Sequence, residues 1–109
     1  MVVHVVLLKP RADLTPSDSA AFVSALERAI KDIPTVRGVR VGRRVTFGAG
    51  YEKTAPDAAD FLAVFEFDDV AGLQSYLQHP AHVELGRRFN ESMAAGLVYD
   101  FELVDVREI

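Results

Sequence analysis

The segment Val2-Val3-His4-Val5-Val6-Leu7-Leu8 decides the fold. It is apolar and mostly β-branched at nearly every position, which predicts a strand buried on both faces rather than one alternating between core and solvent. The segment Phe61–Phe67 has the same character and is interrupted only by Glu66. Each face of the sheet that contains these strands therefore needs a cover.

A first helix is predicted after the opening strand. In Thr15-Pro16-Ser17-Asp18, Thr15 is a suitable N-cap, Pro16 suits the first helical position, and Asp18 completes a variant of the capping box. Apolar residues then recur at helical spacing until Pro34, which cannot continue a helix.

The second half of the chain predicts two further helices in succession. Asp68-Asp69 caps a short helix over 70–78, and Pro80 ends it. A longer helix is predicted over 81–95, with Gly96 as its end. His82 shares a stripe of this helix with Leu85, Phe89 and Met93, because those offsets fall on one side at about 100° per residue. His82 should therefore point inward.

Two weaker strands complete the pattern. The range 38–47 is interrupted by arginines and should be partly exposed, and a loop over 48–58 follows it. In the last strand, 97–106, Tyr99 is expected on the core face with Leu97 and Phe101. Asp100 alternates with these residues and is expected in solvent or at the rim of a dimer.

The resulting order, βαββαβ, predicts a ferredoxin-like α+β sandwich in one domain, residues 1–109, with helices on one face of an antiparallel sheet. If His4, Val6 and Leu8 face the helices, an apolar set remains on the other face. So much exposed apolar area favours a homodimer packed sheet against sheet. The residues of that second face are Val3, Val5, Leu7, Leu62 and Val64.

Composition and short motifs exclude several classes of function. A net charge of -4 and no basic run argue against nucleic-acid binding, and the absence of cysteine removes thiolate and iron–sulfur chemistry. Histidines at zinc-ligand spacing and a phosphate-binding glycine loop are also absent, so we expect no metal and no cofactor. The apolar start is too short to span a membrane, which favours a cytoplasmic protein.

Six segments together resemble the stress-responsive α/β barrel (Dabb) family. They are His4–Lys9, Ile33-Pro34, Val39–Gly42, Phe65–Asp68, Tyr76–His82 with its His-Pro-Ala-His motif, and Val98–Phe101. The resemblance covers nearly the whole chain and implies a dimer in which two ferredoxin-like sheets form a barrel.

Some members of that family are polyketide cyclases, and the resemblance implies a site by analogy with them. The second histidine of the motif, here His82, would be the general base, and Tyr76 would hold the substrate. The cyclase motif Gly-Tyr-Thr-His is replaced here by Ala58-Ala59-Asp60-Phe61. The implied pocket lining is His4, Val6, Leu8, Phe22, Leu26, Ala63, Phe65, Leu77 and Phe89.

Chemistry and structure compete as explanations of these polar residues. A neutral histidine could remove a proton next to a carbonyl, and a tyrosine hydroxyl could polarise that carbonyl. Alternatively, His82 packs in the core and bonds a backbone carbonyl or Tyr76, and His79 caps carbonyls at a helix end. His4 would then be a core or interface histidine that is bonded across the sheet. We therefore expect a protein that binds a small apolar or aromatic carbonyl compound and cyclises, isomerises or oxidises it. The alternatives are a non-catalytic stress-responsive dimer and a cofactor-free monooxygenase.

Overall fold

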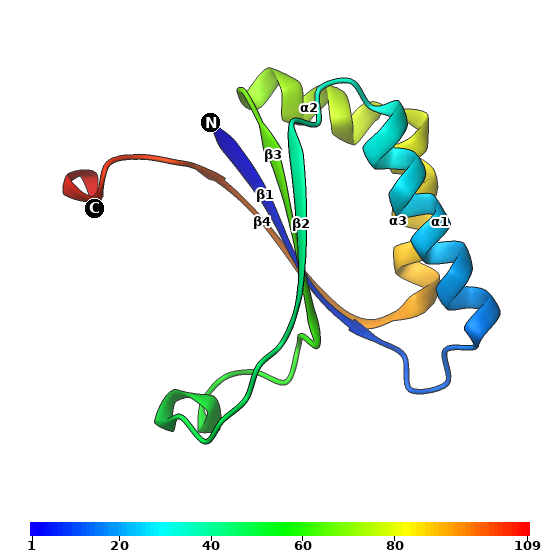
Figure 1. Cartoon of the computed structure of the whole chain (residues 1–109), viewed down its shortest axis with the longest axis vertical. Helices are drawn as coiled ribbons and strands as arrows, with labels where there is room; N and C mark the ends of the chain where they lie inside the picture. Colours follow the sequence, from blue (N-terminus) through cyan, green and yellow to red (C-terminus); the bar gives the residue numbers. More distant parts are fainter.

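The computed structural model describes residues 1–109 and contains one four-stranded antiparallel sheet with its helices on one side (Figure 1). The strands are β1 (Val2–Pro10), β2 (Gly38–Arg43), β3 (Phe61–Phe67) and β4 (Met93–Glu102), in the spatial order β2-β3-β1-β4. The helices are α1 (Pro16–Asp32), α2 (Val70–Gln78) and α3 (Pro80–Ser92). The predicted α+β class and βαββαβ order are confirmed.

The helices begin where local signals predict. The Thr15 hydroxyl accepts a hydrogen bond from the Asp18 amide at 3.1 Å, and Pro16 is the first residue of α1. The Asp69 carboxylate caps α2 by accepting from the Gly72 amide at 2.8 Å. These caps satisfy amides that the first helical turn leaves without partners.

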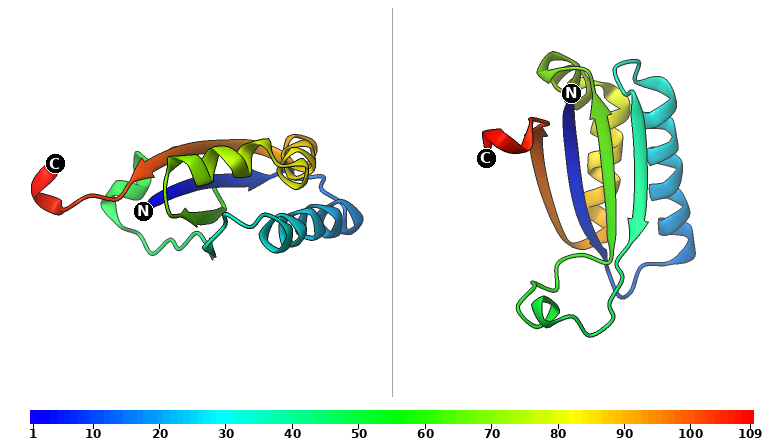
Figure 2. Two further views of the ribbon diagram at one scale, coloured as in Figure 1. Left: turned by 90° about the horizontal axis from the view of Figure 1, so that it is seen from above. Right: turned by 60° about the vertical axis from the view of Figure 1, so that its left-hand side comes forward.

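The strand register separates the two faces of the sheet. His4 pairs with Phe65, Val6 with Ala63, and Leu8 with Phe61, all on the side of the helices. Their alternating neighbours on β1 and β3 lie on the other side, which no helix covers (Figure 2). We call that side the open face: it comprises Val3, Val5, Leu7, Leu62 and Val64, with Leu97, Tyr99 and Phe101 from β4 and the ion pair of Arg40 with Glu66.

Several element ends differ from the prediction: besides those of β2 and the last helix, β4 stops at Glu102 rather than at residue 106. β2 stops at Arg43 rather than at residue 47, because its partner strand β3 begins only at Phe61, opposite Arg43. The range 44–60 forms a loop with a short 3-10 helix, Gly50–Lys53. The last helix ends at Ser92 rather than at residue 95, because pairing with β1 begins at Met93, opposite Pro10.

The side chains of β4 are also turned relative to the prediction. Tyr99 pairs with Val5 and so lies on the open face, not in the core, where it is 52% exposed. Asp100 pairs with His4 and lies on the side of the helices, where its side chain is 45% exposed, as the expected contact with solvent requires. The alternation within β4 was predicted, but its absolute direction depends on the register with β1.

The core is concentrated under α2 and the adjoining part of the sheet. Phe65, Phe67 and Tyr76 are its largest fully buried side chains. Ala29 and Ile33, at the end of α1, are also buried, whereas the preceding turns of α1 carry several exposed residues. No helix is long and apolar enough to cross a membrane.

Candidate active site

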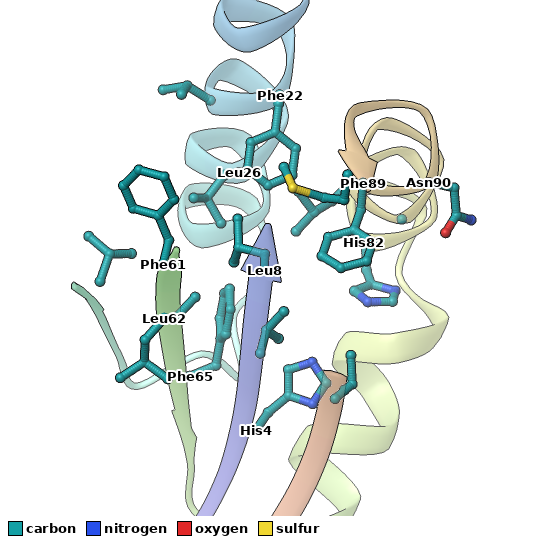
Figure 3. Close-up of a pocket in the computed structure, with 18 of the residues that line it drawn as sticks. His4, Leu8, Phe22, Leu26, Phe61, Leu62, Phe65, His82, Phe89 and Asn90 are labelled. Carbon is teal, nitrogen blue, oxygen red and sulfur yellow. The ribbon is translucent and has the colours of Figure 1, made fainter. Parts of the chain in front are cut away.

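A cavity of about 540 Å³ lies between the helix-facing side of the sheet and helices α1 and α3 (Figure 3). All eleven residues predicted for the site line it. They come from β1, β3 and all three helices, so the cavity forms only when these elements meet. The eleven are His4, Val6, Leu8, Phe22, Leu26, Ala63, Phe65, Tyr76, Leu77, His82 and Phe89.

The cavity also contains residues that sequence reasoning missed. Ser19 and Val23 precede Phe22 and Leu26 at helical spacing, so the period of α1 could have identified them. Met93 shares the predicted inward stripe of His82, whereas Val98 could not be assigned without the register of β4. The other missed residues are Pro10, Leu14, Val41, Phe61, Leu62, Leu85, Gly86 and Asn90. The lining contains no lysine, arginine, aspartate or glutamate, which suits an uncharged ligand.

Tyr76 is the aromatic centre of the site. Only 1% of it is exposed, and its ring centroid lies 4.6 Å from that of His82 and 5.7 Å from that of His4. Burial raises the pKa of the Tyr76 hydroxyl because the phenolate would lose its hydration. The hydroxyl therefore keeps its proton at neutral pH and can only act as a hydrogen-bond donor or a neutral acceptor.

The hydrogen bonds of His82 define which ring nitrogen is basic. Its Nδ1 lies 3.1 Å from the carbonyl oxygen of Leu77. A carbonyl can only accept, so Nδ1 carries the proton and Nε2 of the neutral ring keeps its lone pair. Burial lowers the pKa of His82, the Leu77 carbonyl partly opposes this, and the neighbouring His4 lowers it further. His82 is thus neutral at pH 7 with Nε2 available as a base.

His4 is held by a residue from another strand. Its Nδ1 lies 2.6 Å from Oδ1 of Asp100, and only 4% of the histidine is exposed. The predicted bond across the sheet is confirmed, and its partner is the aspartate that was expected in solvent or at a rim. Because the carboxylate receives the Nδ1 proton, Nε2 is again the nitrogen left for other contacts.

His79 lies outside the cavity lining and joins α2 to α3. Its Nδ1 accepts a hydrogen bond from the Ala81 amide at 3.0 Å, so it caps the start of α3. The prediction that it caps the carbonyls of α2 is wrong in direction. The His79 carbonyl also accepts from the His82 amide at 2.9 Å, which ties the position of His82 to this junction.

The arrangement offers acid–base chemistry in an apolar space. Two histidines flank a buried tyrosine, and each histidine has its Nδ1 engaged by a protein acceptor. No group of three histidine, cysteine, aspartate or glutamate side chains is placed to hold a metal ion. These residues can accept a proton and donate a hydrogen bond.

Comparisons with known proteins identify relatives of the chain and proteins that share its fold. The chain is 25% identical over 100 residues to olivetolic acid cyclase from Cannabis sativa, covering 92% of this chain and 94% of that protein. Two solved structures share the fold. One is a protein from Thermobifida fusca described as dimeric and ferredoxin-like, with TM-score 0.71, 22% identity, and coverage of 94% of this chain and 90% of that one.

The other is a hydroxynitrile lyase from Passiflora edulis, with TM-score 0.74, 15% identity, and coverage of 96% of this chain and 94% of that one. At these identities the two structures establish the fold alone. The model of the stress responsive A/B barrel domain matches residues 2–103, nearly the entire chain. The protein is therefore a member of the stress responsive A/B barrel domain (Dabb) family.

Proposed function

We propose that this protein binds a small, uncharged apolar or aromatic carbonyl compound in the cavity and transfers a proton at the carbon next to the carbonyl. The observation that carries the proposal is the Nδ1 bond of His82 to the Leu77 carbonyl, which leaves Nε2 as a neutral base beside Tyr76. The similarity to olivetolic acid cyclase supports the same class of chemistry, since a ring that closes onto a carbonyl carbon needs a carbon nucleophile such as an enolate.

The proposed step balances without a cofactor. His82 Nε2 takes a proton from the carbon next to the carbonyl, and the C–H electron pair becomes the double bond of an enolate. The carbonyl π electrons move to oxygen, where the Tyr76 hydroxyl donates a hydrogen bond to the developing charge. The His82 imidazolium then returns a proton to the enolate, at the same carbon or another. Alternatively the enolate carbon attacks a second carbonyl within the ligand and closes a ring, and the imidazolium protonates the alkoxide that this attack forms.

Deuterium exchange tests the base. Purified protein is incubated with a methyl alkyl ketone in D2O, and loss of the protons next to the carbonyl is followed by NMR. His82→Ala should slow exchange by about a hundredfold or more, the usual contribution of a positioned base. His79→Asn is the matched control, because it changes the other motif histidine but keeps an acceptor for the Ala81 amide. Equal rates in H82A and wild type would refute the base.

A non-catalytic binding dimer is the second candidate, and one observation favours it. Both cavity histidines already have protein hydrogen-bond partners, Leu77 and Asp100, as structural residues would. In that case wild-type protein binds the ketone but exchanges none of its protons, and His82→Ala lowers thermal stability only. Binding and exchange, measured on the same samples, separate the two candidates.

We further propose that the chain acts as a homodimer in which two open faces pack together. The face carries three large exposed side chains of β4, namely Leu97, Tyr99 and Phe101, with exposed fractions of 37%, 52% and 53%. Apolar strand residues surround them, and such a patch is typical of a sheet-to-sheet contact. The related protein from Thermobifida fusca, described as dimeric, supports this arrangement.

A further inference from the structure

Gly96 lies inside β4 on the side of the helices, opposite Leu8 of β1. The sequence suggested a helix end at this position, but the residue sits in the middle of a strand, where glycine is unfavourable. A Cβ built at Gly96 would lie 2.8 Å from Cε1 of Phe89 and closer still to Cζ. The Phe89 ring therefore rests directly on the backbone of β4, in space that any other residue would occupy.

The same ring forms part of the cavity wall. Phe89 belongs to the partly buried residues packed against the core and lines the cavity together with Leu8, Phe22 and Met93. Figure 3 shows its ring between His82 and Phe22. Contact with Gly96 keeps the ring against β4 and out of the free volume of the cavity.

We propose that Gly96 determines how long an apolar chain the cavity accepts. This inference rests on the proposed function for the class of ligand, an uncharged carbonyl compound whose oxygen lies near Tyr76 and His82. Its chain must then pass Phe89 to reach the apolar part of the cavity. A methyl group at position 96 would displace the ring from β4, and the adjacent free volume is the cavity itself.

A homologous series of methyl ketones, from methyl butyl to methyl decyl ketone, tests this role by calorimetric titration. In Gly96→Ala the short members should bind as in wild type. The long members should lose affinity by about fourfold for each methylene that no longer enters the cavity. Gly50→Ala is the matched control, since no atom lies within 4 Å of a Cβ at that loop position.

Phe89→Leu shows whether the effect acts through the ring. A smaller side chain at position 89 should extend binding to longer ketones, and adding Gly96→Ala in that background should change little. Circular dichroism of each variant verifies folding. If wild type binds none of the ketones, the proposed ligand class is wrong. If wild type binds the series and folded G96A shows the same length dependence, the role of Gly96 is refuted. A folded F89L with an unchanged length limit would refute it as well.

Discussion

His82 and His4 present the same ring nitrogen to their surroundings for different reasons. His82 in α3 directs its Nδ1 proton to the Leu77 carbonyl at the end of the adjacent helix α2. His4 directs its Nδ1 proton to the Asp100 carboxylate on the neighbouring strand β4. Burial lowers the pKa of His82, so its ring is neutral at pH 7 and its Nε2 can accept a proton.

The pH dependence of exchange follows from the lowered pKa of His82. The ordinary value is 6.5, and burial shifts the folded value below it. The base is deprotonated above pH 6.5, so the exchange rate should be constant there and fall on acidification, with a midpoint below 6.5. The groups that face His82 are Tyr76, which stays protonated, and His4 with its partner Asp100.

The same shift contributes to stability. The unfolded chain binds a proton at His82 below pH 6.5, whereas the folded chain binds it only at lower pH. This contribution to the free energy of unfolding is therefore fully present above pH 6.5 and is lost as the pH falls through that window.

Exchange rates from pH 5 to 8 on a single ketone, compared with those of H79N, measure the pH dependence of exchange. A midpoint at or above 6.5 would contradict the assignment of His82 as a buried neutral base.

At the scale of elements, the junction between α2 and α3 holds the site in place. His79 ends α2 and caps α3, in an extended backbone conformation with φ -68° and ψ 140° that suits both an N-cap and a residue before proline. Tyr76 comes from the last turn of α2 and His82 from the first turn of α3. The cap therefore fixes the relative position of the two proposed catalytic side chains.

Loss of this cap should destabilise the protein. His79→Ala removes the acceptor of the Ala81 amide and should lower the free energy of unfolding by about 1 kcal/mol, a typical cost for an N-cap. His79→Asn offers an oxygen in place of Nδ1 and should retain most of the stability. Urea denaturation of both variants gives the comparison. Equal stability of H79A and wild type would mean that the cap contributes nothing measurable.

At the scale of the whole molecule, one sheet serves two purposes. Its helix-facing side lines the cavity, and its open face carries an apolar surface that no element of the chain covers (Figures 1 and 2). Arg40 and Tyr99 lie in the same row of the open face, on the two edge strands. A two-fold axis parallel to the strands would bring each Arg40 over the Tyr99 of the second copy, where a cation can stack on an aromatic ring.

A charge in this face should prevent association. Leu97→Asp would bury a carboxylate between two apolar sheets in a row of the open face that holds no charged residue, so the variant should be monomeric at concentrations where wild type is dimeric. Val83→Asp is the control, since Val83 is 63% exposed on α3, outside the open face. Light scattering coupled to size-exclusion chromatography distinguishes the two sizes. A monomeric wild type at every concentration would refute the proposed dimer.

Much of the fold could be predicted because its signals are local. Thr15 with Pro16 and the two-sided apolar pattern of β1 act through neighbouring backbone or through burial of a whole segment. The boundary between α3 and β4 could not be predicted, because Met93 to Ala95 suit a helix and only pairing with β1 draws them into a strand. The prediction that Tyr99 lies on the core face was wrong for the same reason, since the face of a strand residue depends on that register.

Periodicity along the chain was sufficient for the α+β order. The resemblance to the Dabb family, including its His-Pro-Ala-His motif, implied the family and the eleven side chains that meet at the cavity. Only the tertiary structure assigned Asp100 to His4 and Gly96 to the seat of Phe89, because both pairs join segments that are far apart in sequence or turned by a strand register. Contacts of this kind depend on how strands align, and strand alignment is a property of the assembled sheet rather than of any single segment.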